Sequence, residues 1–250
     1  MTYRPTPALT RSLSIVIPAY DEEKRLSGTL ERITSYLKSG KWKFSEVIVV
    51  DDGSRDRTVR VAEKFRARVC SVRVLRNPGN RGKGYSVRHG MMEAKGEWTL
   101  FTDADLSTPI EELEKLWTAA QEARAQVAIG SRALDRSLIG VHQPFFRESA
   151  GKVFNLAARV ITGLPFWDTQ CGFKLFETRA AREIFRRQQL ERFGFDVEVL
   201  FIARKLGYSS IEVPVRWNDV AGTKVGAVSG LSAFLDPLRV RLHQLRGRYR

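Results

Sequence analysis

Long apolar runs are missing from this sequence. A transmembrane helix needs about 20 consecutive apolar residues, and no stretch approaches that length, which excludes a multi-pass membrane protein. Residues 1–12 are polar with two prolines and lack the apolar core of a signal peptide, so they do not indicate export. We therefore expect a cytoplasmic protein with neither a signal peptide nor a transmembrane segment.

Cysteine is also scarce. Cys70 and Cys171 are the only two in 250 residues, and their wide separation argues against a disulfide framework or a zinc site. Each lies among apolar residues, which predicts two buried free thiols in a reducing compartment.

Acidic residues are outnumbered, with 28 Asp and Glu against 42 Lys and Arg, which gives a net charge of +14. Such a charge bears on partners rather than on fold. Nucleic acid, a phosphorylated substrate and an anionic membrane surface are candidates, and a soluble Arg-rich protein is the plain alternative. Apolar residues make up 43% of the chain, which excludes disorder as a class and suffices for one sizeable core.

Strand and helix patterns alternate along the first half. Apolar runs at 13–17, 47–50, 69–75, 98–102 and 127–130 predict strands, and segments 26–37, 59–65 and 84–94 are typical of helices. Thr108, Pro109 and Glu111 predict a helix start with a capping box. Apolar strands separated by helices predict an α/β fold with a mainly parallel sheet, covered by helices on both faces.

The second half is less regular. Helices are expected over 148–162, 180–188 and 196–206, the last ending at Gly207, and extended segments over 174–176 and 211–215. We expect a tail at 1–12, one domain at 13–226 and a basic segment at 227–250. Within the domain, 13–131 and 132–226 form two halves with different roles.

Acidic residues follow the predicted strands, where ligands bind in such sheets. Asp103-Ala104-Asp105 puts two carboxylates within reach of one hard cation, Mg²⁺ or Mn²⁺, which would neutralise a phosphate leaving group. A polar turn is the alternative. Asp51-Asp52-Gly53-Ser54 ends the second strand, and its carboxylates suit ribose hydroxyls or a base N–H. A purely structural Asp-Gly turn explains this second segment as well.

A glycine-rich segment at 77–84 precedes the third predicted helix. It departs from the Walker pattern because no Ser or Thr follows Lys83, and the G-x-G-x-x-G spacing is absent. Arg81 and Lys83 suit a nucleotide phosphate, and an ordinary exposed loop is equally compatible with this composition.

Five segments occur in an order that resembles a known family. They are Pro18-Ala-Tyr-Asp-Glu22, Asp51-Asp-Gly-Ser54, Asn80-Arg-Gly-Lys-Gly84, Asp103-Ala-Asp-Leu-Ser107 and Asp168-Thr-Gln-Cys-Gly-Phe-Lys174. Across roughly residues 12–226 the chain resembles the inverting GT-A glycosyltransferases of family 2. Within that family it is most similar to the polyprenyl-phosphate (dolichyl-phosphate) glucose and mannose synthases. The resemblance implies a GT-A fold and a nucleotide-sugar donor.

The resemblance also implies a donor site at the strand ends. Asp103 and Asp105 match the family's metal-binding motif. The residues that match its nucleotide-sugar site are Pro18, Tyr20, Glu22, Asp51, Asp52, Gly53, Lys83, Asp103 and Ala104. Lys224 matches an element of a mobile loop that closes on the donor diphosphate. Thr223 replaces the serine of that element, and the arginine often found upstream is missing.

Arg132 and Arg147 resemble the family's acceptor-phosphate residues, and a buried phosphate dianion does need guanidinium partners. Because this phosphate is already ionised at neutral pH, the implied reaction needs no strong general base and inverts the anomeric carbon. Asp105, Asp168 and Lys224 are the candidate catalytic residues. Asp168 is expected either near the sugar or as a brace for its own loop.

The C-terminal segment combines leucines with arginines. After the helix start at Asp236-Pro237, Leu238, Leu242 and Leu245 fall on one helical face. The surrounding arginines are Arg239, Arg241, Arg246, Arg248 and Arg250. Such a helix suits a membrane interface with anionic headgroups, which predicts peripheral attachment at the cytoplasmic face of a membrane. A surface helix packed on its own domain is the alternative.

The leading hypothesis is therefore transfer of glucose from UDP-glucose to a polyprenyl phosphate. A GDP-mannose donor and a soluble acceptor stay open as alternatives within the family. A nucleic-acid-binding protein is disfavoured, because the basic residues are dispersed and no nucleic-acid-binding motif is present. The sequence does not indicate the oligomeric state.

Overall fold

A seven-stranded sheet forms the centre of the molecule, in the order β3-β2-β1-β4-β7-β5-β8. The computed structural model describes residues 11–38, 42–66, 71–220 and 234–250. The strands of the sheet are β1 Ser12–Ala19, β2 Phe44–Asp51, β3 Ser71–Arg76, β4 Trp98–Thr102, β5 Val127–Ser131, β7 Phe173–Glu177 and β8 Ser210–Pro214. A separate parallel pair joins β6 Ile139–Val141 to β9 Trp217–Asn218.

The sheet is mainly parallel, as the strand and helix pattern predicts. β7 is the exception in the described chain, since it runs antiparallel to both of its neighbours, β4 and β5. The sequence pattern placed this strand correctly but carried no signal for its direction.

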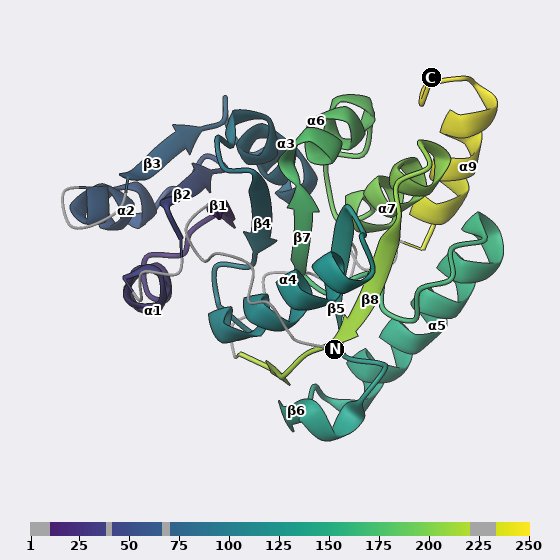
Figure 1. Ribbon diagram of the computed structural model, residues 1–250, viewed down its shortest axis with the longest axis horizontal. Helices are drawn as coiled ribbons and strands as arrows, with labels where there is room; N and C mark the ends of the chain where they lie inside the picture. The colour runs from purple at the N-terminus through teal and green to yellow at the C-terminus, as the bar shows by residue number, and fades with distance from the viewer. Residues whose placement is uncertain (1–10, 39–41, 67–70, 221–233) are drawn as a thin grey trace, which may run out of the picture.

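Helices cover both faces of the sheet (Figure 1). They are α1 Leu26–Leu37, α2 Thr58–Arg66, α3 Lys83–Glu93, α4 Leu113–Glu122, α5 Phe145–Thr162, α6 Thr178–Arg187, α7 Phe195–Lys205 and α9 Asp236–Leu245, with short 3₁₀ turns at Ile110–Glu112 and Arg136–Leu138. Helices α1, α2 and α4 pack on one face. Helices α3, α6 and α7 pack on the other, together with buried residues of α5 and α9. The α/β fold with covered faces is confirmed.

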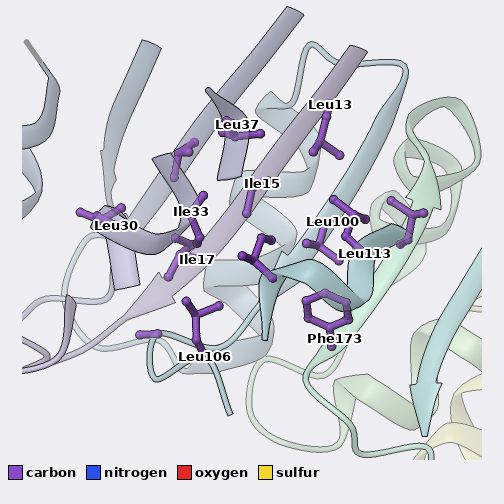
Figure 2. Close-up of a cluster of buried hydrophobic side chains, with 14 of the residues drawn as sticks. Leu13, Ile15, Ile17, Leu30, Ile33, Leu37, Leu100, Leu106, Leu113 and Phe173 are labelled. Atoms are coloured by element: carbon purple, nitrogen blue, oxygen red, sulfur yellow. The ribbon is translucent and has the colours of Figure 1, made fainter. Parts of the chain in front are cut away.

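Figure 2 shows how the periodicity of α1 builds the first of these cores. Leu30, Ile33 and Leu37 recur at helical spacing and lie against Ile15 and Ile17 of β1. Burial of each such side chain contributes about 1.5–3 kcal/mol. β1 alternates between the two cores, because neighbouring side chains of a strand point to opposite faces.

The expected capping box at the start of the fourth helical segment is wrong. Pro109 precedes the 3₁₀ turn in an extended conformation with ψ 142°, and no side chain caps this turn. Thr108 is buried, with its Oγ1 3.9 Å from Sγ of Cys171. Glu111 is exposed and pairs with Arg32 instead of reaching back to the helix start.

Parallel pairing brings the ends of β1, β2 and β4 to one edge of the sheet. Ala19 pairs with Asp51 in the β1–β2 register, and β4 pairs with the other side of β1. The acidic segments that follow these strands are thereby gathered at their carboxyl ends, where ligands of open α/β sheets bind.

Candidate active site

Asp52 fixes the glycine-rich segment that precedes α3. Its side chain is buried. Oδ1 accepts from the backbone N–H of Arg81 at 2.9 Å and from Nδ2 of Asn77 at 2.8 Å, and Oδ2 accepts from the N–H of Gly82 at 2.8 Å. Three donors on one carboxylate hold the segment in a single conformation. Pro78, Gly79 and Asn80 are nevertheless exposed, so this first part is a surface loop whose conformation Asp52 fixes.

The neighbouring carboxylate is less engaged. Asp51 is buried at the end of β2, and its Oδ1 accepts from the backbone N–H of Ser54 at 3.2 Å. On the adjacent β1, Pro18 lies opposite Val50 in the register. Glu22 binds the guanidinium of Arg25 through two contacts of 2.8 Å. These residues line the same edge, as the sequence predicts.

Asp103 and Asp105 follow β4 at this edge. Nζ of Lys83 lies 2.7 Å from Oδ1 of Asp103. Burial alone lowers the pKa of Lys83, but the charges of Asp103 and Asp196 outweigh it, so the pKa is raised and the ammonium stays charged. The pKa of Asp105 is also raised, first by burial and then by the charge of Asp103. The carboxylates of Asp103 and Asp105 and the ammonium group of Lys83 therefore lie close together in a partly buried site.

The 168–172 segment lies directly against Asp103. A Cβ built at Gly172 would come within 2.0 Å of Oδ2 and 2.5 Å of Cγ of Asp103. No other residue type fits there unless the carboxylate moves. Gly172 belongs to one of the motifs that carried the family resemblance, but no local sequence pattern explains why a glycine is needed there.

Arg132 and Asp168 form a bidentate ion pair. Nε and Nη2 of Arg132 lie 2.6 and 2.8 Å from the two carboxylate oxygens, and the backbone N–H of Arg132 donates to Oδ2 at 3.0 Å. Asp168 is buried. Burial alone raises the pKa of Asp168, but the guanidinium outweighs it, and the pKa is lowered. From the sequence we expected separate roles for Arg132 and Asp168, and the structure shows that they form one ion pair.

Comparison with known proteins identifies the family. The family model described as "Glycosyl transferase family 2" matches residues 14–185. The chain belongs to this family. It is 40% identical to the dolichyl-phosphate beta-glucosyltransferase of Drosophila melanogaster, over 85% of this chain and 69% of that protein. It is 38% identical to the dolichyl-phosphate beta-glucosyltransferase of Homo sapiens, over 96% of this chain and 78% of that protein.

Among solved structures, this family 2 glycosyltransferase is similar to glucosyl-3-phosphoglycerate synthase from Mycobacterium tuberculosis. That protein was crystallised with Mn²⁺, UDP and glucosyl-3-phosphoglycerate. The TM-score is 0.62 at 19% identity, over 99% of this chain and 86% of that chain. At this identity the similarity establishes the GT-A fold, which was expected from the sequence.

The donor set at β4 fits a divalent cation. Mg²⁺ is commonly bound by one or two carboxylates, with phosphate and water oxygens completing its shell, and Asp103 and Asp105 provide two oxygen ligands whose charges already interact. Within the described residues, no cluster of three or more His, Cys, Asp and Glu side chains suits a metal. Asp103 and Asp105 alone would leave most of a cation's coordination positions to oxygens from outside the protein.

A second buried ion pair was missed by sequence reasoning. Lys174 is fully buried, and its Nζ donates to Oδ1 of Asp196 at 2.5 Å and to the carbonyl of Cys171 at 2.6 Å. The latter bond fixes the peptide that leads into Gly172. The sequence signal for this pair was a lysine within the predicted strand after Gly172. Because lysines are almost never fully buried without a partner, such a lysine predicts a buried carboxylate beside it.

Several predicted residues lie apart from this cluster or outside the description. Among the described residues, no hydrogen bond or ion pair links Arg147 to the cluster; it is exposed in the first turn of α5. Lys224 and Cys70 lie outside the described residues. Cys171 is a buried free thiol, as expected, and burial raises its pKa to about 11.

Proposed function

We propose that this glycosyltransferase transfers glucose from UDP-glucose to dolichyl phosphate or a related polyprenyl phosphate. The observation that carries the proposal is the similarity to relatives named dolichyl-phosphate beta-glucosyltransferase, which extends over most of both chains. The carboxylates and cations gathered at the strand ends supply the chemistry that such a transfer needs.

On the donor side, Asp103 and Asp105 would hold Mg²⁺ or Mn²⁺, which when bound neutralises charge on the diphosphate. Lys83 contributes a nearby positive charge. The proposed nucleotide-sugar residues are Pro18, Tyr20, Glu22, Asp51, Asp52, Gly53, Lys83, Asp103 and Ala104. Asp52 acts there by holding the 77–82 segment in place. Lys224 is assigned to the diphosphate on the family resemblance alone.

On the acceptor side, Arg132 would bind the phosphate, and Asp168 would orient its guanidinium. The ion pair uses Nε and Nη2 of Arg132, which leaves Nη1 for an oxygen of the acceptor phosphate.

A phosphate monoester is mostly a dianion at pH 7, so its oxygen attacks the anomeric carbon without a general base. Attack from the face opposite the diphosphate inverts that carbon. Catalysis then depends on alignment and on stabilising the leaving charge. Arg147 is a second proposed phosphate residue.

Helices α5 and α9 supply a surface for the lipid end of this reaction. α5 packs against α9, and the two lie together at one side of the molecule (Figure 1). On α5, Val153, Leu156 and Val160 are exposed at helical spacing, and Phe145 and Phe146 at its start are each 85% exposed. On α9 the exposed apolar residues are Leu238, Leu242 and Leu245, preceded by Leu235.

The charges around these helices favour an anionic lipid surface as the occupant. The exposed basic residues are Arg147, Lys152, Arg239, Arg241, Arg246, Arg248 and Arg250. Acidic groups are few. Glu148 is paired with Arg136 and Lys152, and Asp236 is buried. Apolar side chains surrounded by cations are typical of interfacial helices. No described helix combines the length and apolar composition needed to cross a bilayer.

The test is an assay of purified protein with UDP-glucose, Mg²⁺ and a short polyprenyl phosphate. We expect a lipid-linked glucose with the β configuration. Parallel reactions with GDP-mannose, and with water-soluble phosphorylated acceptors, separate the alternatives within the family. Failure to form any lipid-linked sugar from either donor would refute the proposed acceptor.

A further inference from the structure

The segment between α6 and α7, residues 188–194, lies against the glycine-rich segment. Nε2 of Gln188 donates to the carbonyl of Gly84 at 2.9 Å, and the backbone N–H of Tyr85 donates to the carbonyl of Glu191 at 3.0 Å. The guanidinium of Arg81 binds the Glu191 carboxylate through contacts of 3.2 and 2.5 Å. The start of α3 therefore depends on a segment about a hundred residues later in the chain.

The two segments are in close contact. A Cβ at Gly84 would come within 2.7 Å of the Leu190 carbonyl oxygen and 2.8 Å of that of Arg192. Lys83, whose ammonium group lies beside Asp103, directly precedes Gly84 in the chain. Because protein interiors are close-packed, a shift of residues 190–192 reaches the Lys83 backbone directly.

Glu198 on α7 holds the 188–194 segment in place. Its side chain is fully buried, and its carboxylate accepts from the backbone N–H of Gln189 at 3.0 Å and from that of Leu190 at 2.8 Å. The third donor is the hydroxyl of Tyr249, 2.7 Å from Oε1. A buried carboxylate is costly unless its oxygens are hydrogen-bonded, so the tyrosine completes this anchor.

Tyr249 is the penultimate residue of the chain and is 1% exposed. Its ring lies 6.1 Å from that of Phe201 on α7. The other end of the C-terminal helix reaches the same segment, since a Cβ at Gly194 would come within 2.3 Å of Oδ2 of Asp236. Residues 236–250 thus contact both α7 and the segment that α7 supports.

We propose that Glu198 and Tyr249 are positioning residues for the donor nucleotide. The C-terminal segment braces residues 188–194, and these in turn fix the backbone of Gly82–Tyr85, which carries Lys83. This inference rests on the proposed function insofar as the strand-end site binds a nucleoside diphosphate. It assigns to residues 236–250 a role in binding the nucleotide, in addition to any contact with lipid.

The test is Tyr249→Phe, which keeps the aromatic ring and removes the hydroxyl group that donates to Glu198. Tyr208→Phe is the matched control, because its phenol pairs with Glu183, away from the glycine-rich segment. For Tyr249→Phe we expect the Kd for UDP with Mn²⁺, measured by calorimetry, to rise about 3- to 10-fold. The KM for the donor should rise equally, since a lost bond to a buried carboxylate loosens the anchor without unfolding it. The kcat and the KM for the lipid acceptor should stay within about twofold.

The possible outcomes are distinct. Unchanged UDP affinity in Tyr249→Phe, or an equal loss in Tyr208→Phe, would overturn the brace. A rise in both KM values together would also overturn it, because a merely structural defect affects both substrates. Glu198→Gln, verified as folded by its thermal transition, should give a larger loss of the same kind. A wild-type protein that binds neither UDP nor GDP would instead contradict the proposed donor site.

Discussion

The two ends of the sheet differ in how completely their helices bury apolar side chains. At the end formed by β3, β2, β1 and β4, the helices bury their apolar faces, and within the described part of residues 11–131 Phe44 is the one exposed large hydrophobic side chain. At the end flanked by α5 and α9, nine such side chains are exposed on these two helices and at the residue before α9, among them Phe146, Val160 and Leu245. The first end is complete as a folded unit with an organised polar edge. The second leaves apolar side chains exposed, where the proposed lipid surface would bind.

The largest expected effect is on the polar edge, from Asp105→Asn. The change removes one of two carboxylates that would hold the cation, and loss of such electrostatic stabilisation costs about 10²–10³-fold in kcat. Glu122→Gln, at the exposed end of α4, is the control and should leave kcat unchanged. Steady-state assays with the lipid acceptor measure both. Activity retained in Asp105→Asn would remove this carboxylate from the proposed metal site.

Gly172→Ala tests whether the second half of the chain shapes that edge. Its methyl group would meet Oδ2 of Asp103 at 2.0 Å, so the carboxylate must shift. A displacement of about 1 Å in an aligned site costs about 10²-fold in rate. In Gly28→Ala the added methyl meets nothing within 4 Å in α1, and a helical Gly→Ala change should stabilise the fold by about 0.4–1 kcal/mol. Equal activity in the two variants would contradict the close contact.

The buried and exposed ion pairs of the second half should differ in stability. Asp168→Asn leaves Arg132 without its partner and should cost about 3 kcal/mol in the free energy of unfolding, the low end for a buried pair because Arg132 is partly exposed. Glu148→Gln disrupts the exposed pairs with Arg136 and Lys152 and should cost under about 1 kcal/mol. Urea unfolding at pH 7 compares them.

The pH dependence of the Asp168 effect has a definite sign. Because the folded pKa of Asp168 is lowered, its ionised form stabilises the fold above the unfolded pKa of about 3.9. That contribution is lost as the pH falls through the folded pKa. The difference between wild type and Asp168→Asn should therefore be constant from about pH 6 to 8 and shrink below about pH 4. A constant difference at every pH would contradict the ion pair as its source.

Much of the first half was predictable because its signals are local. β4 has the expected bounds, and α1 follows the spacing of Leu26, Leu30, Ile33 and Leu37. The acidic residues after β1, β2 and β4 meet because parallel strands align their ends. What local patterns omit is pairing across the chain: the direction of β7, the Arg132–Asp168 pair and the buried Lys174 each depend on contacts between distant segments.

The C-terminal segment illustrates the same limit. Its leucine stripe was visible in the sequence, and Leu238, Leu242 and Leu245 are indeed exposed. The sequence did not indicate that Val240 and Tyr249 are buried in the same core as α7, nor that α5 presents apolar side chains next to α9. The two sequence interpretations, a helix for a membrane and a helix packed on its domain, are therefore compatible. One side of α9 packs on the domain through Val240, and the leucines on the other side are free for the proposed lipid contact.

The smallest expected effect concerns this outer surface. Leu245→Ser removes an 82% exposed side chain from α9. If it enters the lipid interface, the vesicle partition coefficient should fall about tenfold, the equivalent of roughly 1.4 kcal/mol of lost apolar burial. Val160→Ser on α5 should cause a similar loss. Flotation with vesicles rich in anionic lipid measures both.

Phe44→Ser is the matched control, since Phe44 is exposed at the opposite end of the sheet. It should leave partitioning unchanged. Because Val160 and Leu245 lie on neighbouring helices, their losses should add in the double variant if one flat surface receives both. An α9 loss without an α5 loss would confine the contact to the C-terminal helix. Equal losses in all three variants would instead indicate general apolar adsorption and would erase the difference between the two ends.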